Sequence, residues 1–268
     1  NQSFAQTVLR NPEVSYGELI KVIPSLKNYK VPVGFVPRVS RIGDRILGLE
    51  EENNEPMDRI QNNRPVAADP VVQRAPVSPM AVSVTTQNFA GMGYSSVTPA
   101  DPTLCAGPNH IIQMINGTSG ARMAIWNRSG VQVLTPRFLS TLVASPGYTG
   151  VGDPVAIYDQ FADRYMVTEF GRVSSTAINT LIVFVSQTND PTGGCFIYKF
   201  TDNTFFPDYP HWGVWQNVLY ASTNDFNTAG TAYLGSSVWA IDKAPMIAGN
   251  ASTQLQRFRL SFDCAPVN

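Results

Sequence analysis

The feature that most constrains this chain is a stretch that occurs three times, each time opening with an aspartate. The second copy reads Asp-Pro-Val-Ala-Ile-Tyr-Asp-Gln-Phe-Ala-Asp-Arg-Tyr-Met-Val-Thr-Glu-Phe over residues 153–170, which predicts a strand, a tight polar turn and a second strand. The opening aspartates are Asp101, Asp153 and Asp208, so the copies are spaced by 52 and 55 residues. A repeat of that length, built of strands, is typical of a β-propeller blade.

Each copy continues with enough short alternating segments for four strands. In the first copy the predicted strands are 103–106, 111–115, 122–127 and 131–134. The third and fourth strands are predicted at 180–186 and 195–200 in the second copy, and at 237–242 and 254–260 in the third. The predicted fold class is therefore all-β: a β-propeller of four-stranded blades over residues 81–268, with about three blades visible. Closed propellers use about four to eight blades, so we expect a fragment of a larger propeller, completed by further blades of the same polypeptide or by another chain.

Residues 1–80 differ from the rest and are predicted to form an extended N-terminal arm, a propeptide or a linker. They hold 19 of the 39 charged residues but only four of the 28 aromatic residues. Residues 13–23 have partly helical apolar spacing that ends at Pro24, and 31–36 and 45–49 resemble isolated strands. The prolines between residues 56 and 79 favour an extended segment. Such an arm can lie along another surface and become ordered on contact.

Composition excludes some classes of protein and favours others. The net charge of -1 and the pI near 6.1 give no sign of nucleic-acid binding. No apolar run reaches the roughly 18 residues of a transmembrane helix. Charged residues are only 15% of the chain, and low charge with many Thr, Ser, Asn and Gly is common in secreted all-β proteins. The three cysteines are Cys105, Cys195 and Cys264, and their spacing matches no metal-binding motif. Either they are buried apolar side chains, or two of them form a disulfide and one is left over.

The candidate binding residues come from the repeat itself and from an aromatic cluster in its third copy. Asp101, Asp153 and Asp208 open the inner strands, where they either surround a channel mouth and bind a cation such as Ca²⁺ or cap their own turns. Their recurrence favours the structural role. The cluster includes His211, Trp212 and Trp215, which either stack on sugars or partner side chains or pack between blades. No other cofactor is predicted.

Catalytic arrangements receive weaker support from the sequence. Asp159 and Asp163 flank one turn, and two neighbouring carboxylates could serve glycoside hydrolysis. The alternative is turn formation with an ion pair between an aspartate and Arg164. His110 and His211 are the only histidines, and they lack the Gly-x-Ser-x-Gly motif of many serine hydrolases. We therefore expect a protein that is not an enzyme.

Several motifs resemble those of a known family. They are Ala-Gly-Pro-Asn-His at 106–110, Gly-Asp-Pro-Val at 152–155, Ala-Asp-Arg-Tyr at 162–165, Val-Ser-Gln-Thr-Asn-Asp-Pro-Thr-Gly at 185–193 and Phe-Pro-Asp-Tyr-Pro at 206–210. Together they resemble secreted bacterial β-propellers of large extracellular or surface proteins, often in Bacteroidetes-type species that export cargo with a C-terminal sorting domain. The resemblance covers about residues 83–262. It implies the propeller fold and a secreted or cell-surface location, but it supplies no catalytic residues.

The function expected from these observations is that of an extracellular or cell-surface propeller acting as a non-catalytic binding or structural module in a larger assembly. The alternative is a carbohydrate-active hydrolase with carboxylates at the channel mouth. The expected partner is another protein or further blades, with a glycan as the alternative. Neither nucleic acid nor a transmembrane segment is expected.

Overall fold

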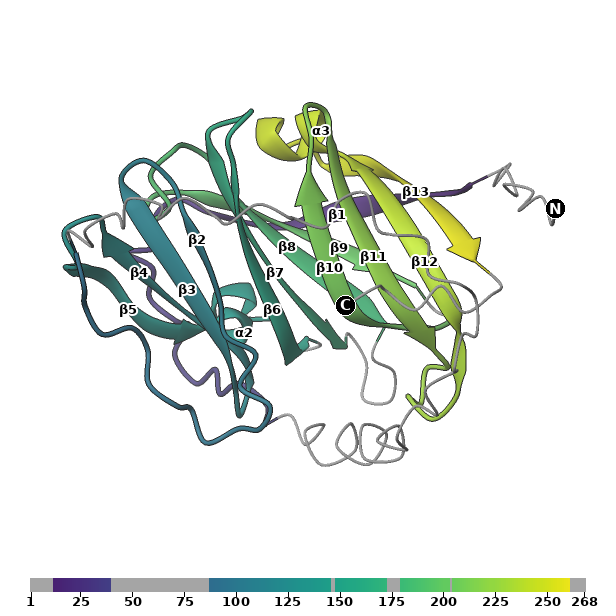
Figure 1. Cartoon of the computed structure of the whole chain (residues 1–268), viewed down its shortest axis with the longest axis horizontal. Coiled ribbons are helices and arrows are strands. Elements are labelled where there is room, and N and C mark those ends of the chain that lie inside the picture. Colours follow the sequence, from purple (N-terminus) through teal and green to yellow (C-terminus); the bar gives the residue numbers. More distant parts are fainter. Residues whose placement is uncertain (1–11, 40–86, 146–147, 173–178, 203, 261–268) are drawn as a thin grey trace, which may run out of the picture.

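The strands of the chain form two antiparallel sheets (Figure 1). The computed structural model describes residues 12–39, 87–145, 148–172, 179–202 and 204–260. The smaller sheet has four strands in sequential order: β2 (Thr103–Ala106), β3 (His110–Gly117), β4 (Gly120–Asn127) and β5 (Gln132–Phe138). The prediction of an all-β fold is confirmed.

The larger sheet has nine strands in the order β10-β11-β12-β13-β1-β9-β8-β7-β6. Its two edge strands, β6 and β10, contact each other, so the sheet curves into a nearly closed, barrel-like shape. The strands in chain order are β1 (Glu13–Ile23), β6 (Thr149–Asp159), β7 (Arg164–Arg172), β8 (Thr180–Ser186), β9 (Cys195–Thr201), β10 (Phe206–Val214), β11 (Val218–Phe226), β12 (Tyr233–Asp242) and β13 (Ser252–Leu260).

Each sequence repeat pairs as a run of four consecutive antiparallel strands: β2–β5, β6–β9 and β10–β13. The strands predicted within the repeats lie within a few residues of the observed ones. The second and third runs are not separate sheets, however, because β1 lies between β9 and β13 and joins them. The arrangement of the runs as propeller blades therefore stays a prediction.

Two apolar cores separate the three runs of strands. The first core lies between β2–β5 and β6–β9, and the second lies between β6–β9 and β10–β13. Strand β8 serves both, because Ile182 and Phe184 point into the first core whereas Leu181, Val183 and Val185 point into the second. Strand β8 is buried along its whole length, which explains its nearly continuous apolar sequence.

The prediction of helical character for residues 13–23 is wrong, since these residues form β1. Of the apolar residues that suggested a helix, Ile23 is buried, whereas Val14, Ile20 and Val22 are exposed. The strand is hydrogen-bonded on both sides, to β13 and to β9. Residues 31–36, read as an isolated strand, form turns instead, and 45–49 lie outside the described residues.

Short connections complete the fold. Helix α2 (Leu139–Val143) follows β5, and helix α3 (Lys243–Ala248) follows β12. Residues 87–100 run over the outer face of β2–β5, where the Phe89 ring lies 6.5 Å from that of Trp126 and the Met92 N–H donates to Gln113 Oε1. In the part of the chain described, no helix has the length and apolar character needed to cross a membrane.

Candidate functional site

The recurring aspartates lie at irregular points of the backbone: Asp101 precedes β2, whereas Asp153 and Asp208 lie within β6 and β10. Asp101 and Asp153 have φ angles of 40° and 47°, and in the third repeat Tyr209, which follows Asp208, has a φ angle of 46°. Asp tolerates this left-handed conformation better than most residues. Strands β6 and β10 both shift register here, as at a β-bulge. The recurrence of these aspartates thus has a backbone explanation.

Asp101 and Asp153 come together around the side chain of Asn116. The Asn116 amide donates to Asp101 Oδ2 over 2.6 Å, and the backbone N–H of Asp153 donates to Asn116 Oδ1 over 3.0 Å. Burial raises the pKa of Asp101, although hydrogen bonds with Asn116 and Asp153 act in the opposite direction. This network connects the start of the first repeat to the start of the second.

The other predicted residues belong to the third repeat, and they face three different regions. His211 is exposed, with its ring 4.4 Å from that of Tyr209. Trp212 points the other way and packs against the second core. Trp215 lies in the turn after β10, is 60% exposed and has its ring 5.2 Å from that of Phe161. Because neighbouring strand residues point to opposite faces, the aromatic cluster seen in the sequence is divided. Asp208 lies opposite Asn224 of β11.

The third repeat has an exposed surface on the side of β10–β13 that faces away from the second core, here called the outer face. Tyr220 and Val238 are its exposed apolar residues, at 42% and 37% exposure. The cross-strand pairs place ten uncharged residues on it: His211, Gly213, Tyr220, Ser222, Asn224, Ser236, Val238, Ala240, Gln256 and Phe258. Two aspartates lie at its ends, Asp208 opposite Asn224 and Asp242 opposite Val218. The outer face continues onto β1, where Val14 and Tyr16 are exposed. It is therefore a partly apolar sheet surface whose centre carries no charged side chain.

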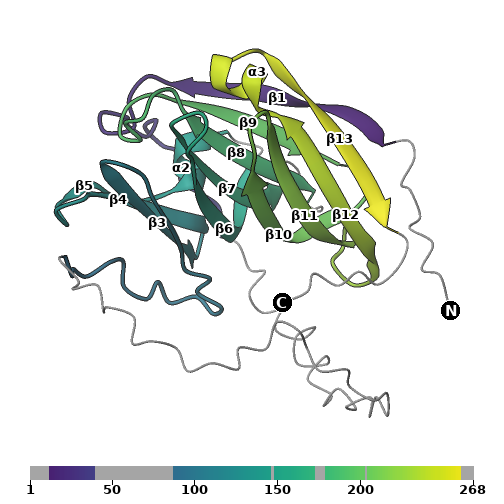
Figure 2. The same cartoon turned by 45° about the horizontal axis from the view of Figure 1, so that its top comes forward.

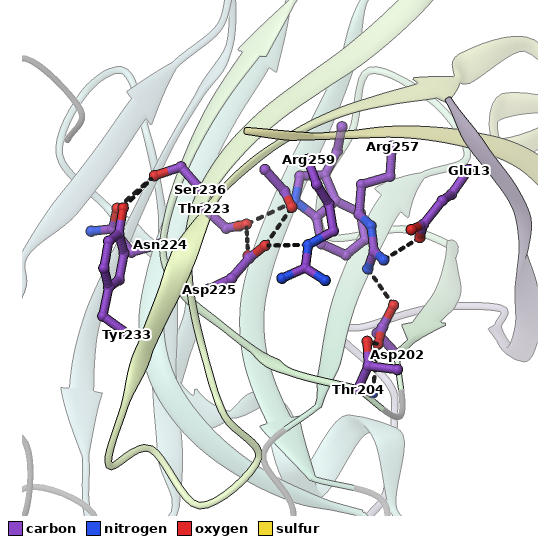
Figure 3. Close-up of polar contacts among 12 residues, drawn as sticks. Glu13, Asp202, Thr204, Thr223, Asn224, Asp225, Tyr233, Ser236, Arg257 and Arg259 are labelled. Carbon is purple, nitrogen blue, oxygen red and sulfur yellow. Dashed lines mark hydrogen bonds and ion pairs between the residues drawn. The ribbon is translucent and has the colours of Figure 1, made fainter. Parts of the chain in front are cut away.

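The opposite side of the same strands carries a buried polar network (Figure 3). The Trp239 indole donates to Thr223 Oγ1, which in turn donates to Asp225 Oδ1; Ser237 donates to Asp225 Oδ2. Burial raises the pKa of Asp225, opposed by these hydroxyl donors and by the charge of Arg259. Every partner belongs to the third repeat, so this carboxylate stabilises its own sheet.

Arg257 of β13 joins three parts of the chain (Figure 3). Its guanidinium group pairs with Glu13 of β1 and with Asp202, which follows β9. It also lies over the Phe205 ring, 4.1 Å from the centroid, and is only 5% exposed. A planar guanidinium group can hold two carboxylates and an aromatic ring at once, which an ammonium group cannot.

Replacing Arg257 by methionine should therefore lower the free energy of unfolding by about 2 kcal/mol, because Asp202 then loses its cation in a half-buried site. Amide hydrogen exchange in β1 should also accelerate. Chemical denaturation and exchange mass spectrometry measure the two effects. Arg128→Met is the matched control, because Arg128 is exposed in the turn between β4 and β5. Equal effects of the two substitutions would contradict the role assigned to Arg257.

The turn aspartates weighed for hydrolysis have structural partners. Asp159 is fully buried, accepts a 2.6 Å hydrogen bond from Lys243 Nζ, and accepts the backbone N–H groups of its own turn. Asp163 is held by Tyr158 and Asn189, and the bond from Tyr158 lowers the pKa of Asp163. Arg164 donates to backbone carbonyls rather than to an aspartate side chain. The turn role is confirmed. The charge of Arg164 also helps to lower the pKa of Asp163, although its hydrogen bonds go to carbonyl oxygens.

Glu169 of β7 is a second buried carboxyl group that the sequence did not single out. It is completely buried, accepts the Ala121 N–H from the first repeat over 2.8 Å, and accepts the Tyr148 hydroxyl over 2.8 Å. Burial raises the pKa of Glu169 to about 8. A neutral carboxylic acid therefore connects the first two repeats at neutral pH.

The remaining reactive groups are the cysteines and the potential metal ligands. Cys105 and Cys195 are free and buried, and burial raises the pKa of each thiol to about 12. Cys264 lies outside the described residues. Among the residues that the structure describes, no three His, Cys, Asp or Glu side chains gather as metal ligands would.

Comparisons with known proteins give no relative, because no family model, curated protein or solved structure matches this chain.

Proposed function

We propose that this chain is a non-catalytic binding or structural module of propeller type, and that the outer face of β10–β13 packs against a further β-sheet. That sheet belongs either to the same polypeptide or to a partner protein. The observation that carries the proposal is the exposure of the apolar centre of this face, formed by Tyr220 and Val238.

The other sheet faces in the described structure support this proposal because they are largely covered, apart from the exposed Leu104 on the edge strand β2. Strands β6–β9 have an apolar core on both sides. The outer face of β2–β5 is covered by residues 87–100, and Trp126 there is only 4% exposed. Sheets that pack face to face normally bury both inner surfaces, and exposed apolar patches often mark interaction sites. The outer face of β10–β13 exposes its apolar side chains on the two central strands of that run, β11 and β12.

A secreted or cell-surface location is part of the proposal. It rests on the low charge content and on the resemblance to secreted bacterial propellers. The hydrolase alternative has less support, because Asp159 and Asp163 are bound within their turn and Asp101 and Asp153 are held by Asn116.

The test introduces charge on the outer face of the full chain. A Tyr220→Lys/Val238→Lys variant should bind less of a hydrophobic dye and self-associate at least about tenfold more weakly than the wild type, because placing a charge against an apolar surface costs more than about 1.4 kcal/mol. Sedimentation velocity and dye fluorescence measure these effects. Circular dichroism verifies folding.

Val131→Lys is the matched control, because Val131 is also exposed but lies in the turn before β5. It should behave as the wild type does. A wild-type chain that stays monomeric and binds no dye would overturn the proposal. Binding on a glycan array that the double variant abolishes would assign the face to sugars rather than to protein.

A further inference from the structure

Strand β1 is inserted between two strands that are remote from it in sequence (Figure 2). It is antiparallel to β13, with Glu13 opposite Arg257 and Glu18 opposite Ser252. On its other side it is antiparallel to β9, with Glu18 opposite Lys199 and Ile23 opposite Cys195. Without β1, the edges of β9 and β13 would both lack a partner strand, and open edges promote aggregation.

The space between β9 and β13 that β1 fills is here called the groove. Side chains fix the position of β1 along it. Glu13 pairs with Arg257 at one end, and Glu18 lies 3.2 Å from Lys199 near the middle. Lys21 donates to the Val143 carbonyl and to the Tyr29 hydroxyl. A shift of two residues would break the contacts with Arg257, Lys199 and Val143 at once, so the register is well determined.

Gly17 provides the sharpest steric constraint. A Cβ atom at this position would lie 2.2 Å from Phe200 Cε1, and Phe200 is buried in the second core. Any larger residue would have to displace a packed ring, which disturbs a well-filled core. The groove therefore selects a strand with a small residue at this point.

The residues that follow β1 add a second anchor. Ile23 and Leu26 are buried in the first core. The backbone N–H groups of Leu26 and Lys27 donate to the carbonyls of Gly193 and Thr192 in the β8–β9 turn. Arg137 of β5 donates to the Leu26 and Tyr29 carbonyls. The segment thus touches all three repeats through non-covalent contacts.

The connection from this segment to the rest of the chain is long. Residues 40–86 separate the described segment 12–39 from the next described residue, whereas most connections in compact domains have about 4–6 residues. At about 3.3 Å per residue a chain of that length reaches roughly 150 Å. The position of β1 is therefore set by its contacts and not by a short covalent connection.

We propose that the groove between β9 and β13 is a peptide-binding site whose ligand is an extended β-strand, filled in this molecule by the chain's own residues 12–39. The ligand is antiparallel to both neighbours, with an acidic residue facing Arg257 and a glycine four residues later under Phe200. The chain binds its segment as a ligand, so the segment stays bound after the connection is cut and exchanges with a free copy. This mode is β-strand addition with main-chain hydrogen bonds on both sides.

The test cuts the full chain between Glu52 and Asn53 at an inserted protease recognition sequence. The two pieces should co-elute in native gel filtration and separate only in denaturant. A fluorescent synthetic peptide of residues 12–39 should then replace the bound segment, as measured by anisotropy. The same peptide with Gly17→Val should bind about ten- to a hundredfold more weakly because of the clash with Phe200.

A peptide with Ser15→Val is the control, since it adds the same side chain at an exposed position of β1. It should bind within about threefold of the native peptide. Three results would each overturn the proposal: pieces that separate in native buffer, a cut protein that never exchanges its segment, or a Gly17→Val peptide that binds as well as the native one.

Discussion

Replacing Lys243 by methionine is expected to lower the free energy of unfolding by about 3–5 kcal/mol. The ammonium group of Lys243 and the carboxylate of Asp159 are 1% and 0% exposed, and they lie 2.6 Å apart. Methionine keeps an unbranched side chain of similar length but leaves the carboxylate buried without its cation. The backbone N–H groups of Phe161 and Ala162 still donate to Asp159, but they carry no formal charge. Equilibrium denaturation at neutral pH measures the loss.

A double-mutant cycle separates the ion pair from packing. Asp159→Asn alone should also destabilise, because Lys243 is then the unpaired charge. The double variant should be more stable than the sum of the single losses predicts, by about 2 kcal/mol or more. Lys199→Met is the matched control, since Lys199 pairs with the 65% exposed Glu18 and such pairs contribute about 0–1 kcal/mol. A Lys243→Met protein within 1 kcal/mol of the wild type would contradict this account.

Local patterns in the sequence predicted most of the strands because alternation is a property of neighbouring residues. Residues 180–186 show this best, since the predicted strand coincides with β8 and its two sets of side chains point into two different cores. The spacing of Asp101, Asp153 and Asp208 also revealed that the strands pair in consecutive groups of four.

The same reasoning failed for residues 13–23 because the pairing of β1 is decided by remote residues. Only Gly17 and Ile23 of this strand are buried, so its sequence lacks the clear alternation of a strand with one buried face. Its partners in β9 and β13 lie more than 170 residues away. The residues near β1 in sequence carry no information about the strand edges of β9 and β13 that β1 pairs with.

The candidate site was predicted in part. The aspartates were predicted to open their strands, but only Asp101 precedes its strand, whereas Asp153 and Asp208 lie within β6 and β10. The sequence also did not show that Asn116 links Asp101 and Asp153. Lys243 and Glu169 were missed because their distinguishing features are not local in sequence. Lys243 has a distant partner, and Glu169 is completely buried. Lys243 lies 84 residues from Asp159, and Glu169 lies 48 residues from Ala121. In both cases a polar group connects two repeats, a relation that appears only once the sheets have packed.

Stability is expected to fall as the pH rises from about 4.5 to 8, and Glu169→Gln should remove much of that fall. Burial raises the pKa of Glu169 to about 8 in the folded protein, from an ordinary value of 4.5. Between these values the folded chain holds a proton that the unfolded chain has released, so rising pH favours unfolding. At about 1.4 kcal/mol per pH unit, Glu169 alone accounts for a loss of about 5 kcal/mol across this range. Chemical denaturation at several pH values measures the slope.

The amide in the Glu169→Gln variant cannot ionise, yet it has nearly the shape of the carboxylic acid. Its oxygen can accept the Ala121 N–H, and its NH₂ group can donate to the Tyr148 hydroxyl, which accepts as well as donates. The variant should therefore match the wild type near pH 5 and exceed its stability near pH 8. Glu18→Gln is the control, because Glu18 is largely exposed and its substitution should leave the slope nearly unchanged. Parallel profiles of unfolding free energy against pH for the wild type and Glu169→Gln would contradict this prediction. They would mean that the carboxyl group is already ionised in the folded protein and leaves an uncompensated charge between the first two repeats.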